Sequence, residues 1–183
     1  MKKLSLLLLI TFFSHCLLYS QEDSKKFSVS ASSGIAFPIF QESFKKSYNA
    51  GYNFAGQIEL SGKNSLLVGM GIDYSRFEHK KMFKNSFDVR TMIFQANAKY
   101  DLFPELFIHP PYLIGGIGLA FISVENAEFQ GNTVPSFHET AASFSIGLGF
   151  SYERFFVESK YNYIDNQKMD INATIPVRIG FRL

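Results

Sequence analysis

The sequence predicts an all-β protein, an eight-stranded antiparallel up-and-down transmembrane β-barrel, and three observations carry this prediction. Residues 174–183 read T-I-P-V-R-I-G-F-R-L, with an apolar residue at every second position. Because side chains alternate across a strand, one face would be wholly apolar and the other would carry two arginines. The chain also begins with an export-type segment, and the remainder is rich in aromatic residues yet lacks an apolar run of helix length.

The first 20 residues have the layout of a secretory signal peptide. Met1-Lys2-Lys3 is a short basic start, residues 4–13 are almost entirely apolar, and residues 14–20 end in small or polar residues. This apolar run is too short for a comfortable transmembrane helix. We therefore expect cleavage after Ser20, which leaves residues 21–183 as one barrel domain. The residues before Cys16, Ser14-His15, do not favour lipid attachment at this cysteine, so we interpret Cys16 as a leader residue that is not lipidated.

The charge balance excludes some classes of partner. Two of the 18 Lys and Arg residues, Lys2 and Lys3, lie in the leader, so 16 remain against 16 Asp and Glu. A neutral chain with no dominant basic stripe argues against nucleic acid as a partner. The single cysteine also lies in the leader, so no disulfide framework and no cysteine-based metal site are expected. No cofactor is expected either.

The first three predicted strands are residues 26–37, 51–61 and 65–76. Each alternates between large apolar residues, which we expect to face outward, and serine, glycine or polar residues, which we expect to face inward. The expected outward residues are Phe27, Val29, Ala31, Ile35, Phe37, Tyr52, Phe54, Ile58, Leu60, Leu66, Val68, Met70, Ile72 and Tyr74. A tight turn at Gly62-Lys63-Asn64 joins the second strand to the third.

The other five predicted strands are residues 88–102, 112–124, 141–152, 155–165 and 174–183. Four of them alternate clearly, with Phe94, Phe144, Phe155 and similar residues outward. The strand at 112–124 is apolar in both phases and rich in glycine, so its pattern allows either orientation. We favour an outward row of Leu113, Ile117, Leu119 and Phe121, with Gly116 and Gly118 inward.

The predicted connections alternate in length. The long polar loops are residues 38–50, 77–87, 125–139 and 166–173, and the shorter turns are residues 62–64, 103–111 and 153–154. Outer-membrane barrels place long loops outside the cell, with short turns and both termini in the periplasm. Three prolines lengthen the 103–111 turn. Pro176 lacks a backbone donor, so we expect it at a bulge or near the rim of the last strand.

A soluble sandwich or a lipocalin-like calyx would also alternate and also carry a leader. Such folds hide apolar residues inside, however, whereas the minor face here holds Ser, Gly, Asn, Gln and charges, which is too polar for a buried soluble core. Aromatic residues also gather at strand ends, as interfacial girdles require. These are Tyr52, Tyr74, Tyr100, Tyr152, Phe155 and Tyr163. We therefore favour the membrane barrel.

With these strands assigned, the chain resembles the small outer-membrane β-barrel proteins, the OmpA-like and OmpX-like group and the related PorT-like barrels. The resemblance covers about residues 25–183 and rests on the strand pattern, on P-Y-L-I-G-G-I-G-L-A-F at residues 111–121 and on the terminal I-G-F-R-L. Leu183 departs from the aromatic residue often found at that position. The resemblance implies a monomer in the outer membrane of a Gram-negative bacterium, in contact with lipopolysaccharide and inserted by a barrel-assembly machine.

Seven charged residues fall on inward positions of the predicted strands. They are Glu59, Asp73, Lys99, Glu158, Lys160, Arg178 and Arg182. An eight-stranded barrel is just wide enough for side chains to fill, and charges held there must pair. Glu158 and either Arg178 or Arg182 lie on neighbouring strands at similar heights, so we expect a pair between them. We interpret the set as a structural plug, with a switchable ion path as the alternative.

Cationic and aromatic residues mix in the second long loop, which reads F-E-H-K-K-M-F-K-N-S-F at residues 77–87. The lysines of this loop and of the first loop are our candidates for binding the phosphates of lipopolysaccharide or of another surface partner. These candidates are Lys45, Lys46, Lys80, Lys81 and Lys84. The alternative is a solvated loop with snorkelling lysines.

One loop brings together residue types that nucleophilic catalysis would need, namely Ser136, His138 and Glu139. Proximity in sequence is not triad geometry, so an enzyme that modifies lipid A is the least favoured hypothesis. The sequence favours a non-enzymatic outer-membrane role, structural or in surface interaction. A small gated pore or transport-associated barrel is the alternative.

Overall fold

A computed structural model describes residues 27–39, 48–62, 65–78, 88–125, 127–129, 132–134, 137–166 and 173–183. Eight long strands build the body of the molecule. They are β1 (Phe27–Ile39), β2 (Gly51–Ser61), β3 (Leu66–Phe77), β4 (Asp88–Asp101), β5 (Pro111–Glu125), β8 (Phe137–Tyr152), β9 (Phe155–Asp165) and β10 (Ala173–Arg182). Two short strands, β6 (Ala127–Phe129) and β7 (Asn132–Val134), form a separate hairpin. No helix among the described residues is long and apolar enough to cross a membrane.

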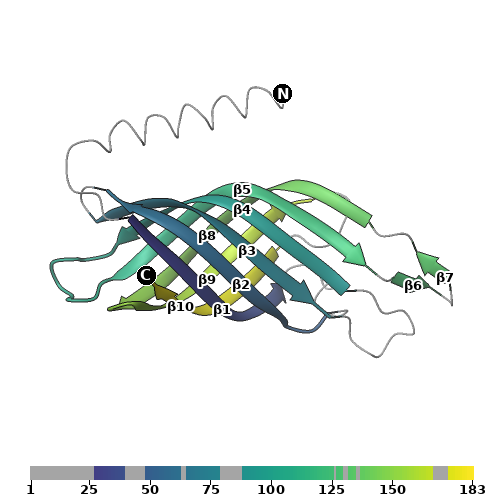
Figure 1. Cartoon of the computed structure of the whole chain (residues 1–183), viewed down its shortest axis with the longest axis horizontal. Coiled ribbons are helices and arrows are strands. Elements are labelled where there is room, and N and C mark those ends of the chain that lie inside the picture. Colours follow the sequence, from purple (N-terminus) through teal and green to yellow (C-terminus); the bar gives the residue numbers. More distant parts are fainter. Residues whose placement is uncertain are drawn as a thin grey trace, which may run out of the picture.

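The eight strands close into a barrel in which every neighbour is antiparallel (Figure 1). Each long strand pairs with the next one in the chain, and β10 pairs with β1 to close the cylinder, for example through Ala31 opposite Phe181. The predicted fold, an eight-stranded antiparallel up-and-down barrel, is confirmed. The structure adds the β6–β7 hairpin to the predicted 125–139 loop, and β8 begins at Phe137, four residues earlier than expected.

The two ends of the barrel differ in character. At the end called here the turn end, residues 62–65, 102–110 and 153–154 connect the strands, and β1 begins and β10 finishes beside them. The connections at residues 40–50, 78–87, 126–136 and 166–172 join strands at the opposite end, called here the loop end; the first three are the longest, and the fourth, of seven residues, is shorter than the nine-residue 102–110 turn. The signal peptide predicted for residues 1–20 lies outside the described residues and stays a prediction.

The outer wall is apolar and the lumen is largely polar. Large apolar side chains such as Ile58, Ile117 and Ile146 are about half exposed, whereas the alternate positions in the same strands are buried. In β5, Leu113, Ile117, Leu119 and Phe121 face outward, which resolves the phase that the sequence left open. A calyx with an apolar interior and a charged exterior would show the reverse arrangement.

Pro176 lies near the loop end of β10 but not at a bulge. The register between β10 and β9 is the same on both sides of it, from Thr174 opposite Asn162 to Val177 opposite Ser159. No extra residue is therefore inserted. Instead, the ladder to β9 is interrupted at residues 175 and 176, while Pro176 still lies opposite Ala36 of β1. The ring faces the lumen, and the missing amide donor removes a bond on one side only.

A group of apolar residues fills the loop end of the lumen, which the sequence analysis did not anticipate. This apolar cap consists of Phe77, Val89, Ile93, Ile122 and Ile164, with Ala36, Tyr48, Ala120 and Ala141. Ile93 lies opposite Asp73 in the β3–β4 register, so the cap begins where the charged interior ends. Tyr48 enters the cap from the connection between β1 and β2. Burial, and then the nearby Asp88 charge, raise the pKa of its phenol, so the hydroxyl stays protonated.

Candidate functional site

The charged residues predicted for the lumen meet in its middle. Six of them are almost completely buried and form what we call the lumen charge cluster: Glu59, Asp73, Lys99, Glu158, Lys160 and Arg178. They come from five strands, and three carboxylates balance three cations. Period-two alternation places each of them inward, because every one is separated from the outward apolar row by a single position.

Arg178 links two carboxylates from opposite parts of the chain. Its guanidinium Nη1 lies 2.5 Å from Asp73 Oδ2, and its Nη2 donates to Glu158 Oε1. Arg178 and Glu158 are direct neighbours in the β9–β10 register, whereas Asp73 reaches across the lumen from β3. A planar guanidinium can serve two carboxylates at once, which makes arginine suited to this bridging position.

Two lysines complete the pairing. Lys99 Nζ lies 2.7 Å from Glu59 Oε1 and 3.0 Å from Glu158 Oε2, and Lys160 Nζ lies 3.5 Å from Asp73 Oδ2. Neutral groups supply further bonds. Asn53 Nδ2 donates to Asp73 Oδ1 at 2.5 Å, and the Tyr112 hydroxyl donates to Glu158 Oε2 at 3.1 Å. Every charge of the cluster thus has an opposite charge beside it, as burial requires.

Two aromatic rings close the lumen between the cluster and the turn end, and we call Tyr112 and Phe156 the aromatic seal. Lys99 Nζ lies over both rings, 5.1 Å from the Tyr112 centroid and 5.3 Å from that of Phe156. Each ring packs against a glycine of the neighbouring strand. A Cβ on Gly149 would overlap the Tyr112 ring, and one on Gly180 would overlap the Phe156 ring. The glycines are therefore needed for the rings to lie across the lumen.

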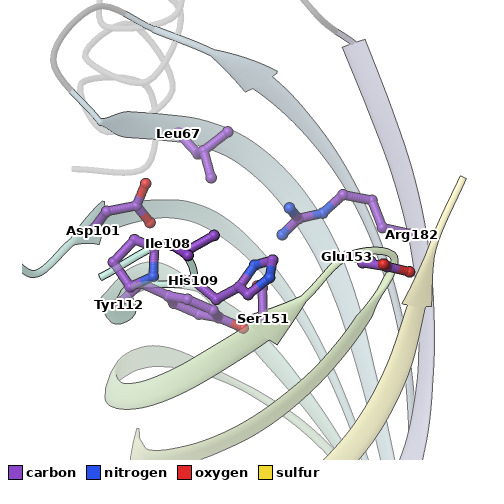
Figure 2. Close-up of a pocket in the computed structure, with 9 residues that line it drawn as sticks. Leu67, Asp101, Ile108, His109, Tyr112, Ser151, Glu153 and Arg182 are labelled. Atoms are coloured by element: carbon purple, nitrogen blue, oxygen red, sulfur yellow. The ribbon is translucent and has the colours of Figure 1, made fainter. Parts of the chain in front are cut away.

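The seventh predicted charge, Arg182, lies nearer the turn end than the cluster. Its Nη2 is 3.6 Å from Glu59 Oε2, and its side chain is 25% exposed. Figure 2 shows its guanidinium reaching into a pocket of about 320 Å³ that His109, Asp101 and Glu153 also line. Two carboxylates here face one guanidinium, so the pocket carries no excess of positive charge for an anionic ligand.

The remaining candidate residues are only partly described. Lys45, Lys46, Lys80, Lys81 and Lys84 all lie outside the described residues, so their surface role stays a prediction.

Ser136 of the least favoured enzyme hypothesis also lies outside the described residues. Its two possible partners are consecutive residues of β8. His138 is exposed on the outer wall, and Glu139 belongs to the opposite, inward face. An arrangement in which Glu139 orients His138 toward a substrate is not formed by these two side chains.

Comparisons with known proteins agree with this architecture. No protein-family model and no curated protein matches the sequence. Among solved structures, Ail, the attachment invasion locus protein of Yersinia pestis in complex with the heparin analogue sucrose octasulfate, superposes with a TM-score of 0.56 at 14% identity, over 87% of this chain and 97% of Ail. Neisserial surface protein A gives a TM-score of 0.53 at 15% identity, over 88% of this chain and 99% of that protein.

The N-terminal β-barrel domain of Pseudomonas aeruginosa OprF is also similar, with a TM-score of 0.50 at 16% identity, over 87% of this chain and all (100%) of the domain. Identities this low show a shared fold and nothing finer. The chain therefore has the fold of the small outer-membrane β-barrels, as the resemblance implied.

Proposed function

We propose that this chain is an outer-membrane β-barrel of a Gram-negative bacterium with a non-enzymatic role, in which a plugged barrel holds surface loops for interaction. The observation that carries the proposal is the inverted distribution of polarity, with apolar side chains around the wall and paired charges inside. A continuous belt of half-exposed Ile, Leu and Phe side chains is unfavourable in contact with water but favourable in contact with lipid acyl chains. The signal peptide predicted for residues 1–20 supports export to that membrane.

The lumen supports a scaffold role over an open pore. The lumen charge cluster fills its middle, the apolar cap lies on one side, and the aromatic seal lies on the other. The interior of an eight-stranded barrel leaves little space beyond its own side chains. We therefore assign specificity to the loop end, which we place at the cell surface, and we place the turn end in the periplasm.

The loop lysines Lys45, Lys46, Lys80, Lys81 and Lys84 are our candidates for an anionic ligand. A cluster of ammonium groups among phenylalanines suits a phosphate or sulfate carried on a lipid or sugar. The Ail structure with a heparin analogue is an example of a barrel of this fold that holds a sulfated sugar. For this chain we propose the phosphates of lipopolysaccharide as the first ligand to test.

The location is tested by heat-modifiability of the protein in purified outer membranes. A closed barrel migrates differently on a gel before and after boiling and resists protease except at its loops. Recovery in the soluble periplasmic fraction, with no shift on boiling, would refute the membrane assignment. Insertion by the barrel-assembly machine predicts that depleting that machine removes the heat-modifiable form.

The surface role is tested with a variant in which all five loop lysines are changed to glutamine. We expect weaker binding to lipopolysaccharide and a shallower dependence of that binding on salt, because fewer charges are screened. Arg154→Gln, which removes an exposed cation at the turn end, is the matched control and should bind as the parent does. Unchanged binding by the five-lysine variant would refute the assignment.

The alternative function is a small gated pore, which the ionisable groups inside the lumen favour. Planar-bilayer recordings separate it from the scaffold role. A scaffold predicts no resolvable conductance from the parent protein or from Arg178→Ala. Discrete openings in the parent that change with Arg178→Ala would favour the pore.

A further inference from the structure

The turn between β4 and β5, residues 102–110, is the most apolar exposed segment among the described residues. Ile108 is 95% exposed, Leu106 70%, Phe103 57% and Phe107 51%. The segment reads L-F-P-E-L-F-I-H-P, in which Glu105 is the one carboxylate and lysine and arginine do not occur. The other two turns at this end are short, and the β8–β9 turn is charged at Glu153 and Arg154.

The backbone of this turn is ordered but strained. Leu102 N–H donates to Pro111 O at 2.7 Å, and Leu106 N–H donates to Phe103 O at 3.0 Å. Phe103 adopts a φ of 55°, a left-handed conformation that bulky side chains rarely take. The Phe103 side chain remains 57% exposed, so burial within the chain offsets this cost only in part. An exposed aromatic residue held in a strained conformation points to a function for that exposure.

The turn continues the apolar outer wall of the barrel. Tyr100 and Leu113 lie opposite each other in the β4–β5 register, one pair away from the turn, and both face outward. The second half of the turn lies at the mouth of the barrel: the His109 ring is 4.7 Å from the ring of Tyr152 on β8, and Ile108 and His109 line the pocket of Figure 2. Phe103, Leu106 and Phe107 do not line that pocket. Figure 1 shows this connection projecting beyond the ends of the neighbouring strands.

We propose that the 102–110 turn is an interfacial anchor that inserts Phe103, Leu106 and Phe107 into the phospholipid leaflet at the turn end. The inference rests on the proposed membrane location of the barrel. The occupant is lipid because the exposed side chains are continuous with the wall that faces lipid, and aromatic residues favour the boundary between headgroups and acyl chains. The turn holds no lysine or arginine, so insertion follows apolar burial and does not depend on anionic headgroups.

The absence of tryptophan from the chain makes the test direct, because one introduced tryptophan is the only such fluorophore. The full mature chain with Leu106→Trp is folded into phosphatidylcholine vesicles that contain lipids brominated in the upper acyl chain, and Phe107→Trp is a second reporter. Two further variants bracket the result. Ile117→Trp lies on the outward face of β5 in the membrane span, and Arg154→Trp lies in the polar turn at the same barrel end.

Emission from Leu106→Trp is expected to be blue-shifted and to lose a large part of its intensity to the bromines, as emission from Ile117→Trp does. Arg154→Trp should stay red-shifted and bright. Replacing a fifth of the lipid by phosphatidylglycerol should leave the Leu106→Trp result unchanged. If Leu106→Trp and Phe107→Trp match Arg154→Trp while Ile117→Trp is quenched, the anchor is refuted and a soluble periplasmic partner becomes the occupant to seek. If Ile117→Trp also escapes quenching, the membrane location itself fails.

Discussion

Replacing Arg178 by methionine removes the guanidinium that joins two buried carboxylates of the lumen charge cluster. Asp73 and Glu158 would then keep their charges in a space closed by the apolar cap and the aromatic seal. The buried balance of three cations and three carboxylates becomes two against three. Breaking a buried ion pair by removing one partner typically destabilises a protein by about 3–5 kcal/mol.

The remaining contacts determine where in that range the loss falls. Asp73 keeps the amide of Asn53 at 2.5 Å and Lys160 at 3.5 Å. Glu158 keeps Lys99 at 3.0 Å, the Tyr112 hydroxyl at 3.1 Å and the Gln57 amide at 3.3 Å. Each carboxylate therefore loses its arginine but retains one lysine and at least one neutral donor. We expect the free energy of unfolding to fall by about 3 kcal/mol, the lower limit for a broken buried pair.

The assay is urea unfolding of the barrel refolded into lipid vesicles, followed by the fraction that remains heat-modifiable on a gel. The control variant combines Arg178→Met with Glu158→Gln, which leaves two buried cations and two carboxylates, paired as Lys99 with Glu59 and Lys160 with Asp73. We expect this double variant to recover a large part of the lost stability, because replacing both sides of a buried pair is often nearly neutral. A loss below about 1 kcal/mol for Arg178→Met alone would be typical of a solvated pair and would refute the sealed lumen.

Three further changes are measured by the same unfolding assay, two in the interior and one on the outer wall. Gly180→Val should lower the free energy of unfolding by about 1–3 kcal/mol, because its side chain would overlap the Phe156 ring. The same change made together with Phe156→Ala should lower the free energy of unfolding by clearly less. Equal losses in both backgrounds would contradict the packing of Phe156 against Gly180. Phe77→Ala should lower the free energy of unfolding by about 3–5 kcal/mol if the apolar cap is packed as a core. A change in stability within experimental error would contradict a packed cap. Arg76→Gln removes the partly exposed pair with Asp88 on the outer wall and should lower the stability less than either interior change, so a loss as large as theirs would mean that this pair is more shielded than its exposure indicates.

Much of the architecture could be predicted from the sequence because a strand has a side-chain period of two. Alternation alone assigned an inward position to Glu59 and Asp73 and an outward position to Ile58 and Ile72. The same rule brought Glu158 and Arg178 to similar heights on neighbouring strands. It could not choose between Arg178 and Arg182, which both alternate inward. The structure pairs Arg178 with Glu158 and brings Arg182 near Glu59 instead.

Two features of the interior could not be predicted from the sequence, for physical reasons. The bridge from Arg178 to Asp73 crosses the lumen between strands that are not neighbours, so it depends on how the barrel closes and not on any local pattern. The apolar cap was missed because inward positions were expected to be polar, and Phe77, Val89 and Ile93 break that rule near strand ends. Outward and inward apolar residues look alike at a strand end, where alternation is too short to separate them.

The bridge between Asp73 and Arg178 also couples the two ends of the chain during assembly. Asp73 is in the third strand and Arg178 in the last, 105 residues later, so the bridge forms only when β10 reaches β1. A partial barrel without β10 would bring Asp73 and Glu158 toward the bilayer without their arginine, at a cost that hydrocarbon makes severe. In the membrane location proposed above, the lumen charge cluster would therefore penalise half-inserted intermediates and favour membrane entry and barrel closure as one cooperative event.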